Sequence, residues 1–501
     1  MHDPRCTPPE EAALEHLLQA SLPELPPAEI AQGVTPWRRA MDRILWGLAL
    51  TSITLQFWNL QYLLPTIGLV LLMLGFRALR RENGWLAGCF VLAAFRLACT
   101  CFLLVINAAL YREVFYALPW NPLSVRLFFY AVQLLQLFCF WQGLRGLQRR
   151  AGQPIRAGGA AALLFWYALL FPLFLLQYQG WFGIIALLVL YYLILRSIYG
   201  LSFNMEKAGY CVRPASVKLS DRMLCLLLCV LLAAGFAGAH LFSSRYAMDW
   251  APAPSAASAD QAACARLAAL GFPQRVLADL TPEDLAACAD AEQVWVHTSD
   301  CSAETNELAV PVPPKHLQIT TVAVRLPGAE EPHYKIFHHF FWAGDLPFYG
   351  TESLQLQAMQ LLDEDRLQEN DVAGQVLYDS SGATYCAPYH AIIAVDTLEE
   401  YDPFFGVSEI HSSKIRAAFS YPARSENQRG YLTYTMDASQ CNENSILYDW
   451  LQYIHQNGWV QYPVRSALSY QAFPYGSDGP FSCFEDTIQL FTNTAASDTA
   501  S

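Results

Sequence analysis

The sequence predicts an α-helical membrane bundle of seven spans, followed by a mainly β-stranded extracytoplasmic domain that forms an antiparallel sandwich with a small helical lead-in. Three observations lead to this fold class. Long apolar segments fill the first half of the chain, clusters of Lys and Arg recur on one side of those segments, and a period-two pattern of aromatic and β-branched residues begins near residue 317. Basic clusters mark cytoplasmic ends, so we expect a cytoplasmic N-terminus and an extracytoplasmic C-terminal half in a multi-pass protein of the cell membrane.

The spans are assigned from the apolar runs between the basic clusters. Residues 1–36 are predicted to be a short cytoplasmic segment and residues 37–244 the seven-span domain. Three antiparallel pairs and one single crossing fit the charge pattern: 44–76 crossing twice with a turn at 59–62, then 85–107 with 123–144, 159–176 with 181–195, and 223–242 alone. A re-entrant first pair would leave the location of the C-terminal half unchanged.

The two halves of the chain differ in charge. Residues 1–244 contain 19 Lys and Arg against 11 Asp and Glu, whereas residues 245–501 contain 12 against 33, which gives the net charge of −13. A strongly acidic C-terminal half argues against nucleic acid as a partner. No apolar stretch precedes residue 44, so we expect the first span to act as an uncleaved signal.

The C-terminal half is divided by composition and rhythm. Residues 245–260 read as a Pro/Ala/Ser linker and residues 261–300 as a short helical subdomain, in which Thr281 is the N-cap of a helix that begins at Pro282. Residues 301–492 are predicted to be the β-rich domain, with one helix at 444–457, and residues 493–501 a disordered tail. The expected strands are 317–326, 334–342, 375–378, 384–396, 415–421, 431–436, 461–473 and 483–491.

Six cysteines lie in the C-terminal half. An even number is compatible with three disulfides in an oxidising exterior, and Cys264 with Cys288 is the first pair that we expect, because both lie on neighbouring short helices. A reduced, buried set of thiols is the alternative. The sequence contains no CxxC motif and its histidines are dispersed, so we expect no zinc site.

A search for catalytic motifs finds no G-x-S-x-G elbow, no P-loop, no H-E-x-x-H and no glycine fingerprint, and we predict no catalytic, cofactor or metal residues. The weak candidates in the β-rich domain are His338 and His339 with Asp345 nearby. Adjacent residues of a strand point to opposite faces, so the two histidines cannot bind one metal together, and a structural role is the simpler interpretation. The many aromatic residues of this half suit either stacking on a sugar ring or packing in a sheet core.

A charged residue lies midway along the third span. Arg96 shares one helical stripe with Thr100 and Asn107, at a depth where insertion of an arginine costs about 2.5–3.5 kcal/mol. Gln133 reaches that depth on the fourth span, Gln136 lies one turn deeper, and Arg126 lies nearer the outside. We expect these residues to form an intramembrane polar site, which is either a clamp between helices or a site for an anionic substrate or lipid head group. A misplaced boundary of the third span is the remaining explanation for a charge at this depth.

Two segments carry a resemblance. Residues 267–288 (LAALGFPQRVLADLTPEDLAAC) and residues 34–39 (VTPWRR) resemble an uncharacterised family of bacterial multi-pass membrane proteins with a C-terminal extracytoplasmic domain. The resemblance covers about a tenth of the chain, and the family has no activity that could be transferred.

Function therefore rests on architecture. A large β-rich domain on a membrane base favours an envelope binding or sensing protein, whose ligand is a glycan, a peptide or a protein. Two alternatives stay open: a transporter or lipid-handling protein that uses the Arg96 site, with membrane lipid as its partner, and an extracytoplasmic hydrolase. The absence of catalytic motifs makes an enzyme the less favoured class.

Overall fold

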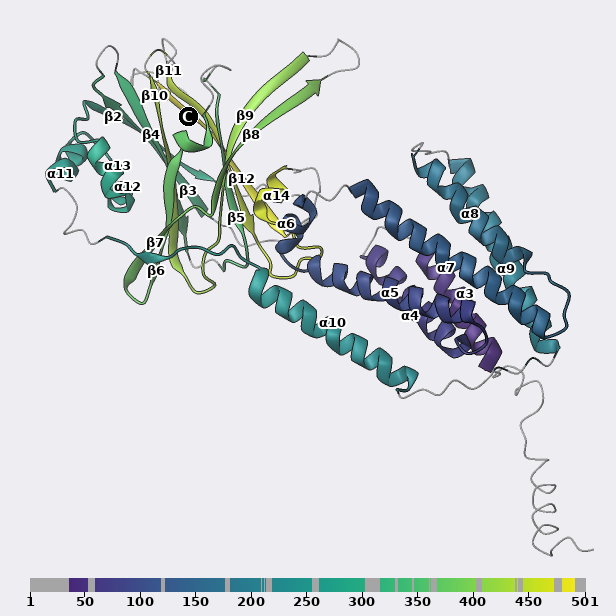
Figure 1. The fold of residues 1–501 in the computed structure, drawn as a ribbon. Coiled ribbons are helices and arrows are strands. Elements are labelled where there is room, and N and C mark those ends of the chain that lie inside the picture. Colours follow the sequence, from purple (N-terminus) through teal and green to yellow (C-terminus); the bar gives the residue numbers. More distant parts are fainter. Residues whose placement is uncertain are drawn as a thin grey trace, which may run out of the picture. The chain divides into compact units, whose positions relative to one another are not determined.

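The chain forms two compact units (Figure 1). A helical unit comprises Met1–Val105 and Tyr116–Gly235, and a β-rich unit comprises Ile106–Phe115 and Phe236–Ser501. The structure is a computed structural model, and the residues that it describes are 36–52, 59–118, 122–175, 181–208, 210, 212, 219–254, 261–301, 316–328, 332–344, 347–359, 361, 367–401, 408–437, 439, 445–472 and 480–491. Asp345, most of the predicted N-terminal segment, residues 255–260 of the predicted linker and the predicted tail lie outside the described residues.

Helices occupy all seven segments that the sequence assigned to spans. They are α3 (Pro36–Ser52), α4 (Leu60–Leu79), α5 (Gly84–Ile106), α7 (Pro122–Arg150), α8 (Gly158–Leu175), α9 (Trp181–Lys207) and α10 (Asp221–Ser243). Among the described residues, α4, α5, α7, α9 and α10 are long and apolar enough to cross a membrane. The apolar part of α8 is shorter, and α3 has 17 residues. Five membrane-capable helices are therefore shown, rather than the seven predicted.

Glycines let the first two helices approach closely. A Cβ atom on Gly47 of α3 would lie 2.7 Å from the carbonyl oxygen of Gly68 on α4, and one on Gly75 would lie 2.8 Å from the carbonyl oxygen of Ala40. Small residues at such positions bring helix backbones together where the hydrophobic effect does not drive association. The α3–α4 pair is thus a tight antiparallel hairpin.

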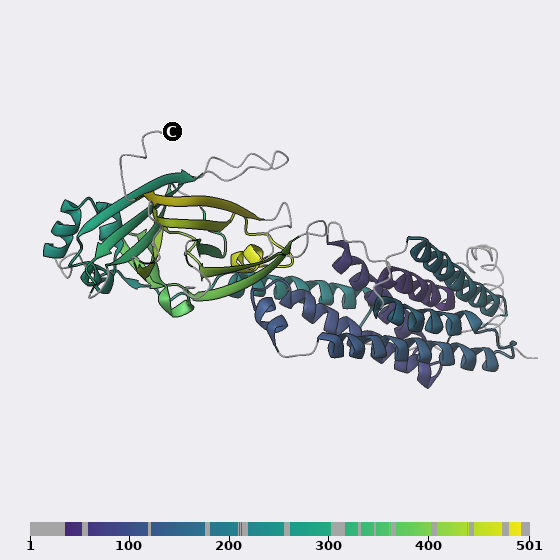
Figure 2. The same ribbon diagram turned by 90° about the horizontal axis from the view of Figure 1, so that it is seen from above.

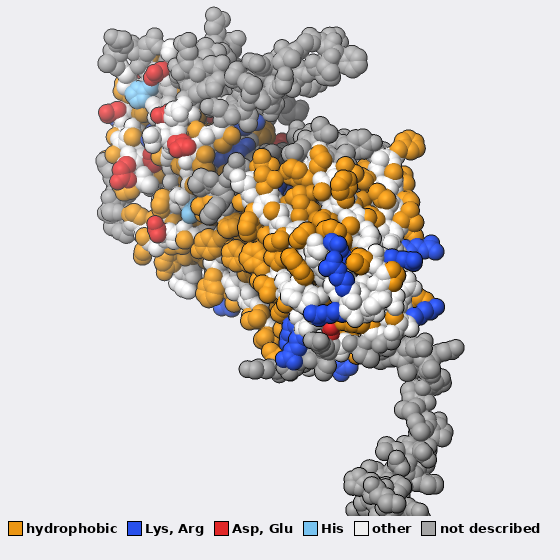
Figure 3. Space-filling model, turned by 45° about the vertical axis from the view of Figure 1, so that its right-hand side comes forward, with side chains coloured by type: hydrophobic (Ala, Val, Ile, Leu, Met, Phe, Trp, Pro, Cys, Tyr) orange, Lys and Arg blue, Asp and Glu red, His pale blue; other side chains and the backbone are white. Residues whose placement is uncertain are grey.

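The basic clusters meet at one end of the helical unit. Asp221, at the start of α10, pairs with Arg43 of α3 at 2.7 Å and with Arg77 of α4 at 3.2 Å. On α7, Arg150 Nη1 donates to the carbonyl oxygen of Glu82, whose side chain accepts from the Tyr210 hydroxyl at 2.5 Å. Figure 3 shows Lys and Arg side chains gathered towards this end of a largely apolar surface. That these clusters share one side of a membrane stays a prediction.

The β-rich unit contains two antiparallel sheets that face each other (Figures 1 and 2). The first has the order β1-β7-β6-β10-β4-β3-β2 and the second the order β12-β11-β5-β9-β8. The strands are β1 (Ala251–Pro252), β2 (Gln293–Cys301), β3 (His316–Leu326), β4 (His333–Ala343), β5 (Glu352–Ala358), β6 (Ala373–Ser380), β7 (Ala383–Pro388), β8 (Ala391–Tyr401), β9 (Ser408–Phe419), β10 (Glu426–Asp437), β11 (Ser445–Gln456) and β12 (Phe481–Phe491). Along one side, Ser299 of β2 donates to Asp486 of β12 and so links the sheets.

One predicted helix is a strand. Residues 444–457 were expected to be helical, but Ser445–Gln456 is β11, paired with β12 on one side and β5 on the other. Its two faces are both covered: Leu451 and Tyr453 join the core between the sheets, while Ile454 packs against Ala467. A strand that is buried on both faces loses the alternation of apolar and polar residues, and its pattern then resembles that of a helix.

Other strand boundaries also differ from the predicted ones. The predicted strand 461–473 is irregular chain followed by a short helix, α14 (Ala467–Ala472). The predicted strand 384–396 is divided between β7 and β8, and β2 and β5 were not predicted. The core between the sheets contains Trp342, Phe340, Phe419 and Tyr453, each at most 1% exposed. These aromatic side chains pack the sheets together, which favours the packing interpretation of this half's aromatic composition.

Three short helices cover the outer face of the first sheet. They are α11 (Gln261–Ala269), α12 (Gln274–Asp279) and α13 (Pro282–Ala287), close to the predicted helical segments. Leu267 and Phe272 pack against Phe337 of β4 and Val322 of β3. Thr281 Oγ1 accepts from the Asp284 backbone N–H at 3.1 Å and caps α13.

The β-rich unit begins earlier than the sequence predicted. Residues 245–260 were assigned to a linker, but Trp250 packs edge-on against Tyr378 at 4.6 Å, and β1 pairs with β7. The Tyr246 ring stacks on His390 at 4.5 Å. Residues 246–252 are therefore part of the folded unit, because large aromatic side chains in this short stretch find partners in its core.

Candidate functional site

Arg96 contacts both predicted amides within the helical unit. Its Nη1 donates to Gln136 Oε1 at 2.7 Å, and its Nη2 donates to Gln133 Oε1 at 3.1 Å. Gln133 and Gln136 are three residues apart on α7, so they lie on one face of that helix. Cys89, two turns before Arg96 on α5, donates its thiol to the carbonyl oxygen of Gln136 at 3.5 Å. Arg96 thus joins α5 to α7 through charge-assisted hydrogen bonds.

Hydroxyl groups from three further helices extend this network. The Tyr167 side chain of α8 interacts with Arg96 and Gln133, and its hydroxyl lies in hydrogen-bond contact with Ser52 Oγ at the end of α3. Ser52 Oγ also lies 2.8 Å from the hydroxyl of Tyr191 on α9, which donates to the carbonyl oxygen of Leu48. Sequence reasoning missed Ser52, Tyr167 and Tyr191, although hydroxyl groups on apolar helices often mark interhelical hydrogen bonds.

The other predicted members of the site lie apart from this network. Arg126 is exposed and Thr100 is half-buried. Asn107 belongs to the β-rich unit, where its carbonyl oxygen accepts from the Val464 N–H at 2.8 Å. Arg96 is therefore bound to α7, whereas Asn107 follows the end of α5 and contacts the β-rich unit through its backbone.

The connection after α5 is built into the β-rich unit. It contains a short helix, α6 (Tyr111–Ala117), that the sequence did not predict. Glu113 accepts from the Ser466 backbone N–H at 2.8 Å and from Ser466 Oγ at 2.8 Å. Arg112 Nη1 donates to the carbonyl oxygen of Val464 at 3.3 Å, and the Leu110 N–H donates to the carbonyl oxygen of Ser243 at 3.0 Å.

Ser466 connects this contact to the sheets. Its Oγ accepts from the Ser469 N–H at 3.0 Å at the start of α14, and the next residue, Ala467, donates its N–H to Thr351 Oγ1 at 2.8 Å. The Tyr246 hydroxyl lies in the same cluster: burial raises its pKa, the hydrogen bond with Ser466 lowers it, and the nearby charge of Glu113 raises it, with a net increase. The carboxylate of Glu113 is thus the acceptor around which the α14 end of the unit is organised.

His338 and His339 point to opposite faces, as alternation along a strand requires. His338 Nε2 lies 2.7 Å from Asp449 Oδ2 of β11, and its Nδ1 lies 2.9 Å from Thr321 Oγ1. The Tyr434 hydroxyl donates to the same Asp449 oxygen at 2.8 Å. A hydroxyl, an imidazole and a carboxylate in this order resemble a catalytic triad, but Thr321, His338 and Asp449 are all 0% exposed. The group links the two sheets through a buried polar network.

His339 faces the helical lead-in instead. Its Nε2 lies 2.9 Å from Asp279 Oδ2 at the end of α12, and Arg429 Nε of β10 donates to the other oxygen of Asp279 at 2.8 Å. Arg429 also pairs with Asp379 at 3.1 Å. Burial lowers the pKa of Arg429, but the charges and hydrogen bonds of Asp279 and Asp379 outweigh it and raise the pKa above its usual value.

A third buried pair of a histidine and a carboxylate was not expected from the sequence. His455 Nδ1 of β11 lies 2.9 Å from Glu352 Oε2 of β5, and both side chains are 0% exposed. Asp449 and His455 lie in the segment that was expected to be helical. The sequence therefore did not predict which strands or side chains they would face. Across the described residues, no group of three His, Cys, Asp or Glu side chains could hold a metal ion.

The predicted bond between Cys264 and Cys288 is not formed. Both residues carry free thiols, Cys264 half-buried and Cys288 buried among the lead-in helices. Burial raises the pKa of the Cys288 thiol to about 12, an effect that Lys335 opposes and Asp284 reinforces. Cysteine here packs as a small apolar residue, the alternative considered from the sequence.

No protein-family model matches this chain, and no curated protein shows significant similarity to it, so the geometry of the two units carries the functional argument.

Proposed function

We propose that this protein is a membrane-embedded sensor, in which an extracytoplasmic β-rich unit recognises an envelope ligand and reports binding to the helices through residues 106–115. The single observation that carries the proposal is the contact of Glu113 with Ser466. It makes the chain between two membrane-capable helices an internal part of the domain that follows the last helix.

The connection offers a physical route for a signal. α5 runs without interruption from Arg96, which is bound to α7, to Ile106, where the β-rich unit begins. A ligand that shifts the position of Ser466 or Val464 changes the hydrogen bonds of Glu113, Arg112 and Asn107. A ligand can shift such an equilibrium only by its difference in affinity for the two states, so the contact must differ between the bound and free forms.

Charge supports the extracytoplasmic placement of the β-rich unit. The basic clusters share one end of the helical unit, and the C-terminal half of the chain is strongly acidic. We expect single cysteines at positions 80 and 150 of a cysteine-depleted chain to be shielded from an impermeant thiol reagent in whole cells, and one at position 258 to be labelled. Labelling of 80 and 150 with protection of 258 would reverse the orientation.

The ligand class is tested by screening. Envelope glycans and peptides are added to the full-length protein in nanodiscs, and hydrogen exchange is followed in the β-rich unit and in residues 104–113. A sensor shows changes in both regions with the same ligand. A ligand that protects the β-rich unit and leaves residues 104–113 unchanged makes the protein a binding protein without signalling through α5.

A second function, transport or lipid handling, is favoured by the Arg96 network. A guanidinium carries five N–H donors. The side-chain oxygens of Gln133 and Gln136 accept two hydrogen bonds from Arg96, so the same guanidinium can also bind an anionic group. Ligand-dependent stabilisation that is lost in Arg96→Met, with no change of exchange in the β-rich unit, would favour this function over sensing.

A further inference from the structure

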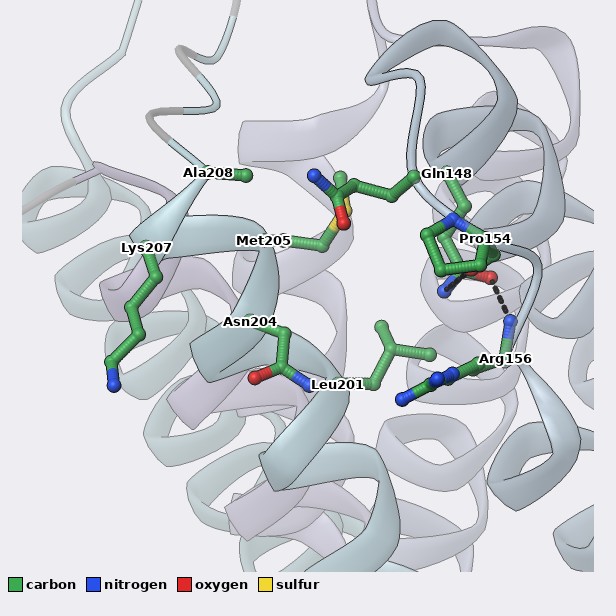
Figure 4. A pocket seen from close by; sticks show the side chains of 9 residues that line it. Gln148, Pro154, Arg156, Leu201, Asn204, Met205, Lys207 and Ala208 are labelled. Carbon is green, nitrogen blue, oxygen red and sulfur yellow. Dashed lines mark hydrogen bonds between the residues drawn. The ribbon is translucent and has the colours of Figure 1, made fainter.

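A cavity of about 430 Å³ lies at the basic end of the helical unit (Figure 4). Its walls are the end of α7, the chain between α7 and α8, and the last turns of α9. The lining side chains that matter for binding are Gln148, Gln153, Arg156, Leu201, Asn204 and Lys207. This volume is typical of a small-molecule site and exceeds that of a bare inorganic anion.

The lining is positive and rich in hydrogen-bond donors. Arg156 contributes a cation, three amide side chains contribute N–H groups, and none of the nine lining residues is Asp or Glu. Leu201 and Asn204 lie three residues apart on one face of α9, and Ala208 follows the end of that helix. Glu206 contacts Arg38 of α3 at 3.7 Å instead.

Arg156 is presented to the cavity by a fixed loop. Gln148 is buried; its Oε1 accepts from the Arg156 backbone N–H at 3.2 Å, and its Nε2 donates to the carbonyl oxygen of Pro154 at 3.3 Å. Figure 4 shows the Arg156 side chain extending towards Leu201 and Asn204 on the opposite wall, whereas Lys207 extends away along α9. The Lys207 ammonium lies 4.6 Å from the centre of the Phe203 ring.

We propose that this cavity binds a phosphate group, with Arg156 as its principal ligand and the amide of Asn204 on the facing wall. The planar guanidinium matches phosphate oxygens in a bidentate geometry. Basic pockets between helices at the cytoplasmic face of membrane proteins bind the head groups of anionic lipids, and the cavity is large enough for a phosphate with its glycerol. The shared chemistry is a phosphate ester, and a free phosphate is the other source.

The test uses the full-length protein in detergent, with phosphatidylglycerol, phosphatidylcholine or inorganic phosphate as probes. Thermal unfolding reports stabilisation and native mass spectrometry reports retained lipid. We expect phosphatidylglycerol to stabilise the wild type more than phosphatidylcholine does, and its affinity to fall at least about tenfold in Arg156→Gln. Asn204→Leu should also weaken the binding of phosphatidylglycerol. The affinity of Arg156→Lys should lie between those of Arg156→Gln and the wild type, because an ammonium keeps the charge but lacks the two parallel N–H donors of a guanidinium.

Arg149→Gln is the matched control, because Arg149 is exposed at the same end of α7 and does not line the cavity. Arg149→Gln should bind phosphatidylglycerol as the wild type does. Stabilisation by inorganic phosphate that depends on Arg156, without preference between the two lipids, assigns the same site to a free phosphate. An equal loss in Arg149→Gln and Arg156→Gln, or no effect of any probe on the wild type, would overturn the proposal.

Discussion

Glu113 accepts two hydrogen bonds from Ser466, a residue 353 positions later in the chain, and this contact makes a connection between helices part of the β-rich unit. The carboxylate receives a backbone N–H and a hydroxyl at the start of α14, so it acts as a cap that is supplied from a distant segment. Every consequence for signalling depends on this pair.

Weakening the pair should destabilise the β-rich unit. We expect Glu113→Gln to lower its free energy of unfolding by about 1–2 kcal/mol, because hydrogen bonds to a charged acceptor contribute more than those to a neutral one. Ser466→Ala should cost a similar amount, and the double variant should cost less than the sum of the two. Chemical denaturation of the full-length protein, followed by hydrogen exchange in residues 464–470, measures the effect. Additive costs would show that the two side chains do not interact.

Arg96 and its amides separate fold maintenance from ligand binding. Arg96→Met removes a charge together with its desolvation cost, so we expect stability in detergent to hold or rise. Gln133→Leu should be the harmful change, at about 1–3 kcal/mol, because it leaves a guanidinium short of acceptors. Gln142→Leu is the control, since the Gln142 oxygen lies 3.5 Å from Arg145 at a half-buried position. A tolerated Gln133→Leu, with no effect of anions on melting, would remove both the clamp and the anion site.

Asp379 should make the β-rich unit sensitive to acid. Burial raises the pKa of this carboxyl. Hydrogen bonds from Asn427 and Thr384, together with the charge and hydrogen bond of Arg429, outweigh burial and bring the pKa below its usual value. A depressed folded-state pKa stabilises the fold above the unfolded value of about 3.9, and the stabilisation is lost as the pH falls through the folded value. Asp379→Asn should therefore flatten the fall of stability below about pH 4 in urea titrations at several pH values. Asp290→Asn, at an exposed site, should keep the wild-type slope.

The thiols of the lead-in helices should stay reduced. Because the thiolate is the reactive form and the pKa of Cys288 is raised to about 12, iodoacetamide at pH 8 should leave Cys288 unmodified in the folded protein and modify it after unfolding. Cys264, which is half-buried, should react first. A linked Cys264–Cys288 peptide in a non-reducing digest of protein purified from cells would show that the two thiols form a disulfide.

The helical unit was more predictable from sequence than the β-rich unit, for physical reasons. The rise of a helix is constant, so counting residues from the span ends placed Gln133 at the depth of Arg96 and Gln136 one turn deeper, and the structure shows both residues in contact with Arg96. Strand β11 is buried on both faces, so its pattern did not distinguish a strand from a helix. The buried contacts of Asp449 and His455 on this strand were therefore not predicted.

Contacts between distant segments were beyond the reach of local patterns. Nothing near Glu113 marks Ser466 as its partner, because a single carboxylate in a short connection is usually solvated. Trp250 was a better signal: an aromatic residue inside a Pro/Ala/Ser stretch indicated that the stretch packs against something.

Hydrogen exchange in the full-length protein tests most directly the central claim that the β-rich unit reports to α5 through residues 106–115. Ser466→Ala perturbs the unit at the contact, and Ser482→Ala is the matched control, because Ser482 accepts from Asn457 at 2.6 Å on β12. We expect Ser466→Ala to speed amide exchange in residues 464–470 and also in residues 104–110, whereas Ser482→Ala leaves residues 104–110 unchanged. Faster exchange in residues 464–470 with no change in residues 104–110 would contradict the claim.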